Sequence, residues 1–182
     1  MVRSLVFLIP ILLAATIPAT VQMQEHAQTP ARPLVHEWLF DVSVELEEPL
    51  DIGPTGAGRR EIVYIRRGAI DGPRLQAEVL PGGGDWLLRR EDGSLLLDIR
   101  ATARTRDGHL IYVSARGHLW LTPQAMQQMQ QGKPVAAAEQ YFRVAYTFET
   151  GAEAYAWLNR TLAVGVGEFR PGLVKISVYA IR

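Results

Sequence analysis

The sequence predicts a mainly β fold: a single antiparallel β-barrel of about eight to nine strands with two short helices. Three observations predict it. Apolar and polar residues alternate with period two along most segments. Turn signals rich in glycine, proline and aspartate recur between these segments at hairpin spacing. The chain also ends on a strand pattern, and a closed sheet leaves no exposed edge. A β-sandwich is the alternative.

Residues 1–19 have the pattern of a secretory signal peptide, with Arg3 before an apolar run and small residues after it. The apolar run is too short to span a bilayer. Residues 20–33 lack apolar periodicity and are expected to be a flexible lead-in. The barrel domain then covers residues 34–182. We expect an exported protein, periplasmic or secreted, with an uncleaved N-terminal anchor as the alternative.

The composition excludes several classes of function. The chain contains no cysteine, so disulfides and thiolate chemistry are absent. Its 19 basic and 19 acidic residues form no basic stripe, which argues against a nucleic-acid partner. No second apolar run reaches membrane-spanning length. The four histidines have no ligand-like spacing, so we expect no metal and no cofactor.

The strands follow one another at regular intervals. The alternation predicts them over residues 35–46, 60–66, 74–80, 86–90, 95–106, 110–116, 141–149, 161–169 and 173–182. Glycine and proline make residues 51–58 a loop. Asp107-Gly108 is the strongest hairpin signal in the chain.

Two helices interrupt the strands. Thr122 followed by Pro123 is an N-cap with proline at the first helical position, and Gly132 ends this helix. Thr150 and Glu153 have the spacing of a capping box, which predicts a helix through Asn159.

The hairpin at Asp107-Gly108 also predicts which side chains share a face. A two-residue loop places Thr102 opposite Val113, and opposed residues share a face of the sheet. Asp98 and Arg100 would then lie with Thr102 among apolar neighbours, which is typical of a ligand pocket. The opposite face, which begins with Leu95 and Leu97, could equally be the core side.

Two dense segments carry a family resemblance: PGGGDW at residues 81–86 and FETGAEAYAWLN at residues 148–159. Together they resemble the DUF3237 family, also called UPF0311, which are small β-barrel proteins of unknown function. The resemblance covers residues 34–182 and implies a calycin-like or allene-oxide-cyclase-like barrel. It implies no particular reaction.

The candidate catalytic residues are Asp98 and Glu149. Asp98 would be a general base, with Arg100 or Arg143 stabilising negative charge. The alternative for Asp98 is a structural ion pair. Glu149 would be a second carboxylate at the barrel mouth, or would support the helix that follows it.

Further side chains are candidates for ligand binding because they combine flat aromatic surface with polar groups. They are Asp85, Trp86, Arg100, Arg143, Tyr155, Trp157 and Asn159. The alternatives are structural. The glycine run before Asp85 is then a tight turn, the tryptophans fill the core, and Tyr155 and Asn159 hold their helix to the barrel.

We therefore carry three hypotheses. The first is an exported barrel that binds a small organic molecule and performs acid–base chemistry on it, as a lyase, isomerase, cyclase or hydrolase. The second is a carrier that leaves its ligand unchanged. The third is a structural barrel or a homo-oligomer. Barrels host all three kinds of function, so fold alone does not choose among them.

Overall fold

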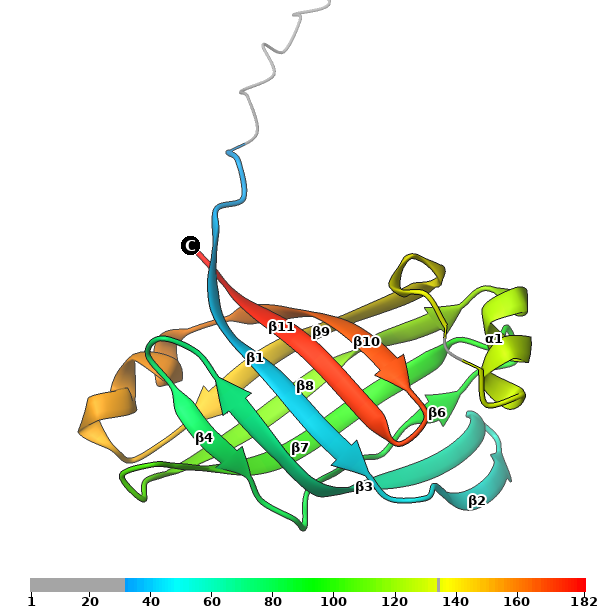
Figure 1. Cartoon of the computed structure of the whole chain (residues 1–182), viewed down its shortest axis with the longest axis horizontal. Helices are drawn as coiled ribbons and strands as arrows, with labels where there is room; N and C mark the ends of the chain where they lie inside the picture. The colour runs from blue at the N-terminus through cyan, green and yellow to red at the C-terminus, as the bar shows by residue number, and fades with distance from the viewer. Residues whose placement is uncertain (1–31, 134) are drawn as a thin grey trace, which may run out of the picture. The chain divides into compact units, whose positions relative to one another are not determined.

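The computed structural model describes residues 32–133 and 135–182, of which Pro33–Arg182 form one compact unit (Figure 1). The predicted signal peptide and nearly all of the lead-in lie outside the described residues. The strands are β1 (His36–Leu46), β2 (Leu50–Thr55), β3 (Gly58–Asp71), β4 (Gln76–Val79), β5 (Gly84–Asp85), β6 (Leu88–Arg89), β7 (Leu95–Thr105), β8 (Leu110–Leu121), β9 (Gln140–Glu149), β10 (Ala163–Arg170) and β11 (Leu173–Ile181). The helices are α1 (Pro123–Gln130) and the 3₁₀ segments η1 (Ala137–Glu139) and η2 (Glu153–Arg160).

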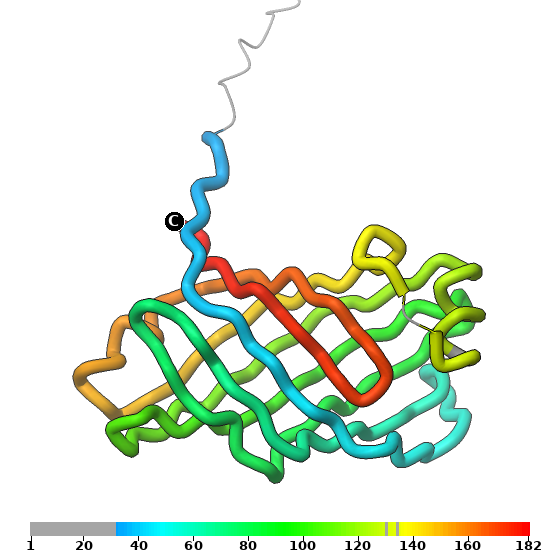
Figure 2. The backbone as a smooth tube through the Cα atoms, in the orientation of Figure 1, coloured from blue at the N-terminus to red at the C-terminus, as the bar shows by residue number. Residues whose placement is uncertain are grey.

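The strands close into an antiparallel barrel, as predicted. Their order is β1, β11, β10, β9, β8, β7, then the short strands β4, β5 and β6 in one position, then β3. β3 pairs with β1 and closes the ring, which can be followed in the backbone tube (Figure 2). β2 lies outside the ring and pairs only with β3. Because β1 pairs with β11 on one side and with β3 on the other, the strands form one closed sheet and not two stacked sheets. The alternative prediction of a β-sandwich is therefore wrong.

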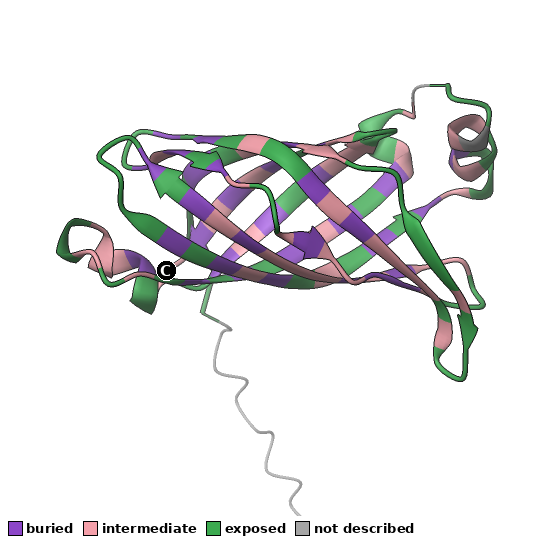
Figure 3. Ribbon diagram, turned by 90° about the horizontal axis from the view of Figure 1, so that it is seen from below, coloured by how far each residue is buried: buried purple, intermediate pink, exposed green. Residues whose placement is uncertain are grey.

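Burial alternates along the strands, as Figure 3 shows. On β9, Phe142, Val144, Tyr146 and Phe148 are buried, and the residues between them face outward. On β10, Gly165 and Gly167 occupy inner positions. A Cβ on Gly165 would lie 2.7 Å from the ring of Tyr146, and a Cβ on Gly167 would lie 2.7 Å from the ring of Phe142. The glycines of β10 therefore make room for the aromatic rings of β9.

The predicted register of the β7–β8 hairpin is wrong by one residue. Thr102 lies opposite Tyr112 rather than Val113. The amide of Thr105 donates to the carbonyl of His109, and Gly108 has a φ of 88°. These features define a three-residue hairpin loop with glycine in the left-handed conformation, where the sequence predicted a two-residue loop. A slip of one residue turns every side chain to the other face of the sheet.

Several element boundaries also differ from the prediction. The expected loop at 51–58 contains most of β2. The expected strand at 86–90 is reduced to β6, and β5 precedes it at the end of the glycine run. A bulge between Trp38 and Phe40 breaks the alternation of β1 and leaves Trp38 exposed. The helix after β9 begins at Glu153, and Thr150 does not cap it. The Thr150 hydroxyl instead donates to the carbonyl of Leu110.

The two ends of the barrel are covered differently, with η2 (orange) and α1 at opposite ends (Figure 1). At the η2 end, Leu158 is completely buried. At the α1 end, the Thr122 hydroxyl accepts from the amide of Ala125, so the predicted N-cap is confirmed. No helix among residues 32–133 and 135–182 is long and apolar enough to cross a membrane.

Candidate functional site

The barrel encloses an inner cavity of about 90 Å³. Asp85 and Tyr146 are its two side chains with hydrogen-bonding groups. The rest of the lining is apolar and includes Phe40, Ile99, Val113, Phe142, Phe148 and Ile176. An apolar cavity with few polar groups is the usual form of a small-molecule site.

A second, larger pocket opens at the α1 end of the barrel. This mouth pocket has a volume of about 460 Å³, and Met129 of α1 lines it together with the β10–β11 turn at Pro171 and Gly172. It shares four lining residues with the inner cavity: Leu46, Asp85, Phe142 and Val174. The two spaces therefore adjoin at these four residues, of which Asp85 is the one with a hydrogen-bonding side chain.

The glycine run before Asp85 explains how the carboxyl group reaches the interior. β5 is inserted between β3 and β7. A Cβ on Gly83 would lie 2.5 Å from the carbonyl oxygen of Arg100, and one on Gly84 would lie 2.9 Å from that of Val63. Only glycine permits so close an approach of the backbones. Asp85 then faces inward, where its Oδ1 accepts from the amide of Asp98 at 2.9 Å.

Burial dominates the electrostatics of Asp85. Loss of solvent raises the pKa of this carboxyl group to about 7 from an ordinary value of 3.8. The hydrogen bond from the Asp98 amide lowers it, the nearby Asp98 carboxylate raises it, and the Arg60 guanidinium lowers it. A carboxyl group that titrates near neutral pH can both accept and donate a proton, as acid–base catalysis requires.

Tyr146 lies on β9 and is 5 % exposed. Its ring stacks beside that of Phe148, with centroids 6.0 Å apart. Among the described residues, none forms a hydrogen bond with its hydroxyl group. Burial, and then the charge of Asp85, raise the pKa of Tyr146 above its ordinary range. The hydroxyl group therefore stays protonated and can donate a hydrogen bond.

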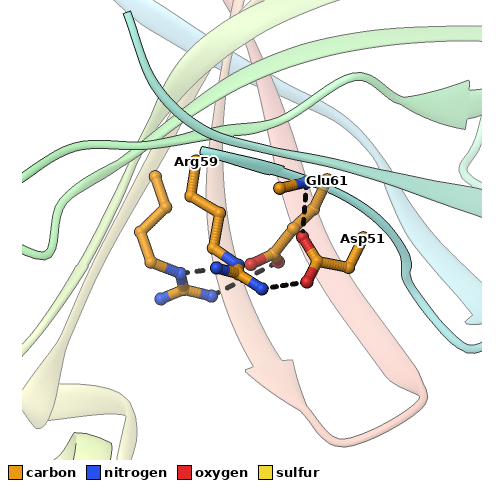
Figure 4. A network of polar contacts seen from close by, with 5 residues as sticks. Asp51, Arg59 and Glu61 are labelled. Carbon is orange, nitrogen blue, oxygen red and sulfur yellow. Dashed lines mark hydrogen bonds and ion pairs between the residues drawn. The ribbon is translucent and has the colours of Figure 1, made fainter. Parts of the chain in front are cut away.

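Glu61 and Arg89 line the mouth pocket and belong to a network of charged side chains (Figure 4). Arg89 donates from Nε and Nη2 to the two oxygens of Glu61, at 3.3 and 3.4 Å. Beside this pair, Arg59 of β3 forms an ion pair with Asp51 of β2. Glu47 and Glu48 also line the pocket. Acidic groups thus outnumber basic ones at the entrance.

Asp98 and Arg100 do share one face of β7, but the predicted inward orientation is wrong. The buried residues of β7 are Leu95, Leu97, Ala101, Ala103 and Thr105, so Asp98 and Arg100 lie on the outer wall. There Asp98 pairs with Arg100 at 3.3 Å and with Arg116 at 3.5 Å. This outer group corresponds to the structural ion pair, the alternative that the sequence analysis left open.

Trp86 and Arg143 lie away from both the inner cavity and the mouth pocket. The ring of Trp86 packs against Tyr64 and lies 5.5 Å from the guanidinium of Arg100. Arg143 is on the outer side of β9, where its guanidinium lies 5.2 Å from the ring of Tyr141.

The remaining predicted residues gather at the η2 end. Glu149 is exposed at the end of β9. The Tyr155 hydroxyl donates to Asp107 at 3.0 Å, and Trp157 lies under the guanidinium of Arg74. Asn159 exchanges two hydrogen bonds with the backbone of Thr150, at 2.8 and 2.9 Å. These contacts attach η2 to the barrel. Of all the predicted site residues, Asp85 alone lines the inner cavity.

Sequence reasoning missed Tyr146, although a signal for it exists. Along residues 141–149 one face carries Arg143, Ala145, Thr147 and Glu149, and the opposite face carries Phe142, Val144, Tyr146 and Phe148. A single hydroxyl group on an aromatic face is the kind of isolated polar group that marks a binding site. Within the part of the chain that the structure describes, no cluster of three His, Asp or Glu residues could hold a metal ion.

Comparison with known families gives one match that spans the barrel. The model of DUF3237, a protein of unknown function, matches residues 35–181. A UPF0311 protein of Clostridium acetobutylicum is 29% identical over 154 residues, which are 84% of this chain and 98% of the relative. A UPF0311 protein of Rhodopseudomonas palustris is 28% identical over 145 residues, covering 80% of this chain and 95% of the relative.

Solved structures share the barrel. A conserved protein of unknown function from Rhodopseudomonas palustris has a TM-score of 0.80 at 28% identity and covers 84% of this chain and 100% of its own. A beta-barrel like protein from Acinetobacter baumannii has a TM-score of 0.74 at 32% identity, with 85% and 100% covered. An enzyme from Penicillium herquei has a TM-score of 0.64 at 20% identity, with 85% and 98% covered, which is a likeness of fold alone.

Proposed function

The chain belongs to the DUF3237 family, and on that premise we propose that it binds a small, mostly apolar organic molecule and transfers protons to and from it with Asp85. The molecule would enter through the mouth pocket and reach the inner cavity. The sequence-based choice of Asp98 as the base is replaced by Asp85, because Asp98 lies on the outer wall.

The position of Asp85 carries this proposal. Among residues 32–133 and 135–182, it is the one carboxyl group that borders both the inner cavity and the mouth pocket. Apolar surroundings raise its pKa to about 7. Buried carboxyl groups with raised pKa values, placed in a cleft, are enriched at catalytic sites. The Penicillium herquei protein with this fold is an enzyme, which agrees with the proposal at the level of the fold.

A carrier is the second candidate, favoured by the apolar lining of the inner cavity. A carrier would hold the same molecule in the same place and return it unchanged. The position of Asp85 between the two pockets and its raised pKa favour acid–base chemistry over simple binding, which needs no group that titrates near neutral pH.

The test compares the wild-type protein with Asp85→Asn and Asp98→Asn, each incubated with a metabolite extract of the producing cells and analysed by mass spectrometry. We expect wild type and Asp98→Asn to consume the same compound, and Asp85→Asn to lose about 10²–10⁴-fold in rate. A compound retained by all three proteins and chemically unchanged would identify a carrier. Loss of turnover in Asp98→Asn alone would overturn the assignment to Asp85.

A further inference from the structure

We propose that the bound molecule carries a carbonyl group, whose oxygen accepts a hydrogen bond from Tyr146 while Asp85 faces the carbon next to it. The inference rests on the proposed function and names its substrate class: a neutral ketone with a proton on the adjacent carbon. Three features of the site support it: the hydroxyl group of Tyr146, the second oxygen of Asp85 and the charges at the mouth.

Tyr146 requires an acceptor. Its hydroxyl group lines the inner cavity and forms no hydrogen bond with any residue that the structure describes. Since the described residues include no fully buried side-chain oxygen or nitrogen without a partner, this hydroxyl group is open to the cavity, and whatever occupies the cavity supplies its partner. Since the group keeps its proton, it serves best as a donor. Its partner is then an acceptor such as a carbonyl oxygen.

One carboxyl oxygen of Asp85 accepts a hydrogen bond within the protein, and the other can interact with a ligand. Oδ1 accepts from the amide of Asp98, which fixes the orientation of the carboxyl group. Among the described residues, none donates to Oδ2. Both groups line the same inner cavity, and the charge of Asp85 acts on the hydroxyl group of Tyr146, so a polar ligand atom in the cavity can lie between them. Tyr146 supplies a hydrogen-bond donor at a fixed position, and Asp85 exchanges protons with the ligand.

The charges at the mouth select against anions. Glu47, Glu48 and Glu61 line the mouth pocket, and Arg89, the basic residue among its lining, is already paired with Glu61. A carboxylate or phosphate ligand would meet like charges at the entrance and a further carboxyl group inside. A neutral ketone is repelled neither by the acidic groups at the mouth nor by the carboxyl group inside. Its hydrocarbon part can pack against the apolar lining of the inner cavity.

The resulting proton transfer balances without another reactant. The Asp85 carboxylate takes the proton from the carbon next to the carbonyl group. The electron pair of that C–H bond forms a C=C bond, and the C=O π pair moves to the oxygen. Tyr146 donates to this oxygen throughout and stabilises its charge most when the charge is greatest. Return of the proton to the same carbon or to a conjugated one completes an exchange or an isomerisation.

The test uses two probes of similar shape, 1-indanone and indane, which differ in the carbonyl oxygen. Both are larger than the inner cavity, so the benzene ring would lie in the adjoining mouth pocket and the carbonyl group of the ketone in the inner cavity. Their dissociation constants would be measured by NMR titration for the wild-type protein, for Tyr146→Phe, and for Tyr141→Phe, a control on the outer side of β9. We expect the wild-type protein to bind the ketone roughly five- to tenfold more tightly. Tyr146→Phe should remove this preference, and Tyr141→Phe should retain it.

A carbon-13 label at the carbonyl of 1-indanone gives a measurement that needs no variant, since a hydrogen bond shifts this resonance downfield in the wild-type complex. Absence of the shift, or ketone binding no tighter than indane, would overturn the inference. A preference for the ketone that persists in Tyr146→Phe would also overturn the inference. The partner of the Tyr146 hydroxyl group would then be a bound water molecule.

Proton transfer has its own readout, which separates the two proposals. In D₂O the protein should speed deuterium exchange at the carbon next to the carbonyl group of 1-indanone, and Asp85→Asn should not. A ketone preference without exchange would contradict the proposed acid–base function and support the carbonyl inference. Exchange that persists in Asp85→Asn would contradict the role of Asp85.

Discussion

At the scale of single residues, the site depends on two polar groups in an apolar cavity. Asp85 and Tyr146 come from β5 and β9, and both line the inner cavity. Removing a carboxyl group from water without a cationic partner disfavours its charged form. The same burial that costs stability therefore gives Asp85 a pKa of about 7. The proposed function of Asp85 and the stability of the fold therefore make opposite demands on this residue.

This opposition predicts a dependence of stability on pH. Asp85 ionises at about 7 in the folded protein and at 3.8 in a solvated chain. Between these values the folded state binds the extra proton, so its contribution to stability is largest below about pH 4 and is lost as the pH rises through 7. The loss is on the order of 4 kcal/mol, from 1.36 kcal/mol for each unit of the pKa difference.

The prediction is tested by the difference in unfolding free energy between Asp85→Asn and wild type, measured in urea at pH 4.5 and 8.5. We expect the variant to gain relative to wild type as the pH rises, because asparagine does not ionise. The charged groups near Asp85, which are Asp98 and Arg60, are common to both proteins. A difference that stays constant over this range would contradict the raised pKa.

At the scale of elements, η2 closes one end of the barrel, and its attachment is specific. Asn159 bonds to the backbone of Thr150, Tyr155 bonds to Asp107 of the β7–β8 loop, and Leu158 is fully buried. The mouth pocket lies at the opposite, α1 end, and the proposed ligand would enter there. The FETGAEAYAWLN segment serves this closure, since its side chains lie outside the inner cavity except for Phe148.

Truncation of the η2 anchor should destabilise the protein. Leu158→Ala removes a fully buried side chain and leaves a void, at a cost of about 2–5 kcal/mol. Leu162→Ala is the matched control, because Leu162 is 54% exposed and its truncation should change stability by less than about 0.5 kcal/mol. Urea unfolding of both variants checks the prediction. Equal effects would mean that Leu158 is not an anchor.

At the scale of the whole molecule, the barrel exists because β3 pairs with β1. We call the β1–β3 pairing the seam. The seam joins β1, at one end of the strand order, to β3, near the other end, and so closes the sheet on itself. Gly68 stands at this seam, opposite Val44 on one side and Val79 on the other. Closure also brings β5 and β9 around one cavity, although they are not neighbours in the sheet.

A larger residue at Gly68 should weaken the seam. A Cβ there would lie 2.5 Å from Val44 Cγ1 and 2.6 Å from the carbonyl oxygen of Ser43, so Gly68→Ala should cost about 1–3 kcal/mol. Gly151→Ala is the control, since nothing lies within 4 Å of its added Cβ. Hydrogen exchange should accelerate first in the β1–β3 amides. Faster exchange confined to β8–β9 would contradict the assignment of the seam.

The sequence by itself determined the class of fold and the local features. Period-two alternation predicted the barrel strands, Thr122-Pro123 predicted α1, and the glycine run of PGGGDW indicated a tight turn before Asp85. All of these depend on neighbours in the chain. The family also followed from two short segments.

Only the tertiary structure decided which side chains form the site. One extra residue in the loop at Gly108 shifted the register, so Asp98 and Arg100 turned outward. Because the side-chain period of a strand is two, so small a change in a loop reverses a whole face. The meeting of Asp85 with Tyr146 required closure of the barrel between strands that are distant in the sheet. Local alternation can place residues on a face, and only closure fixes which face is inside.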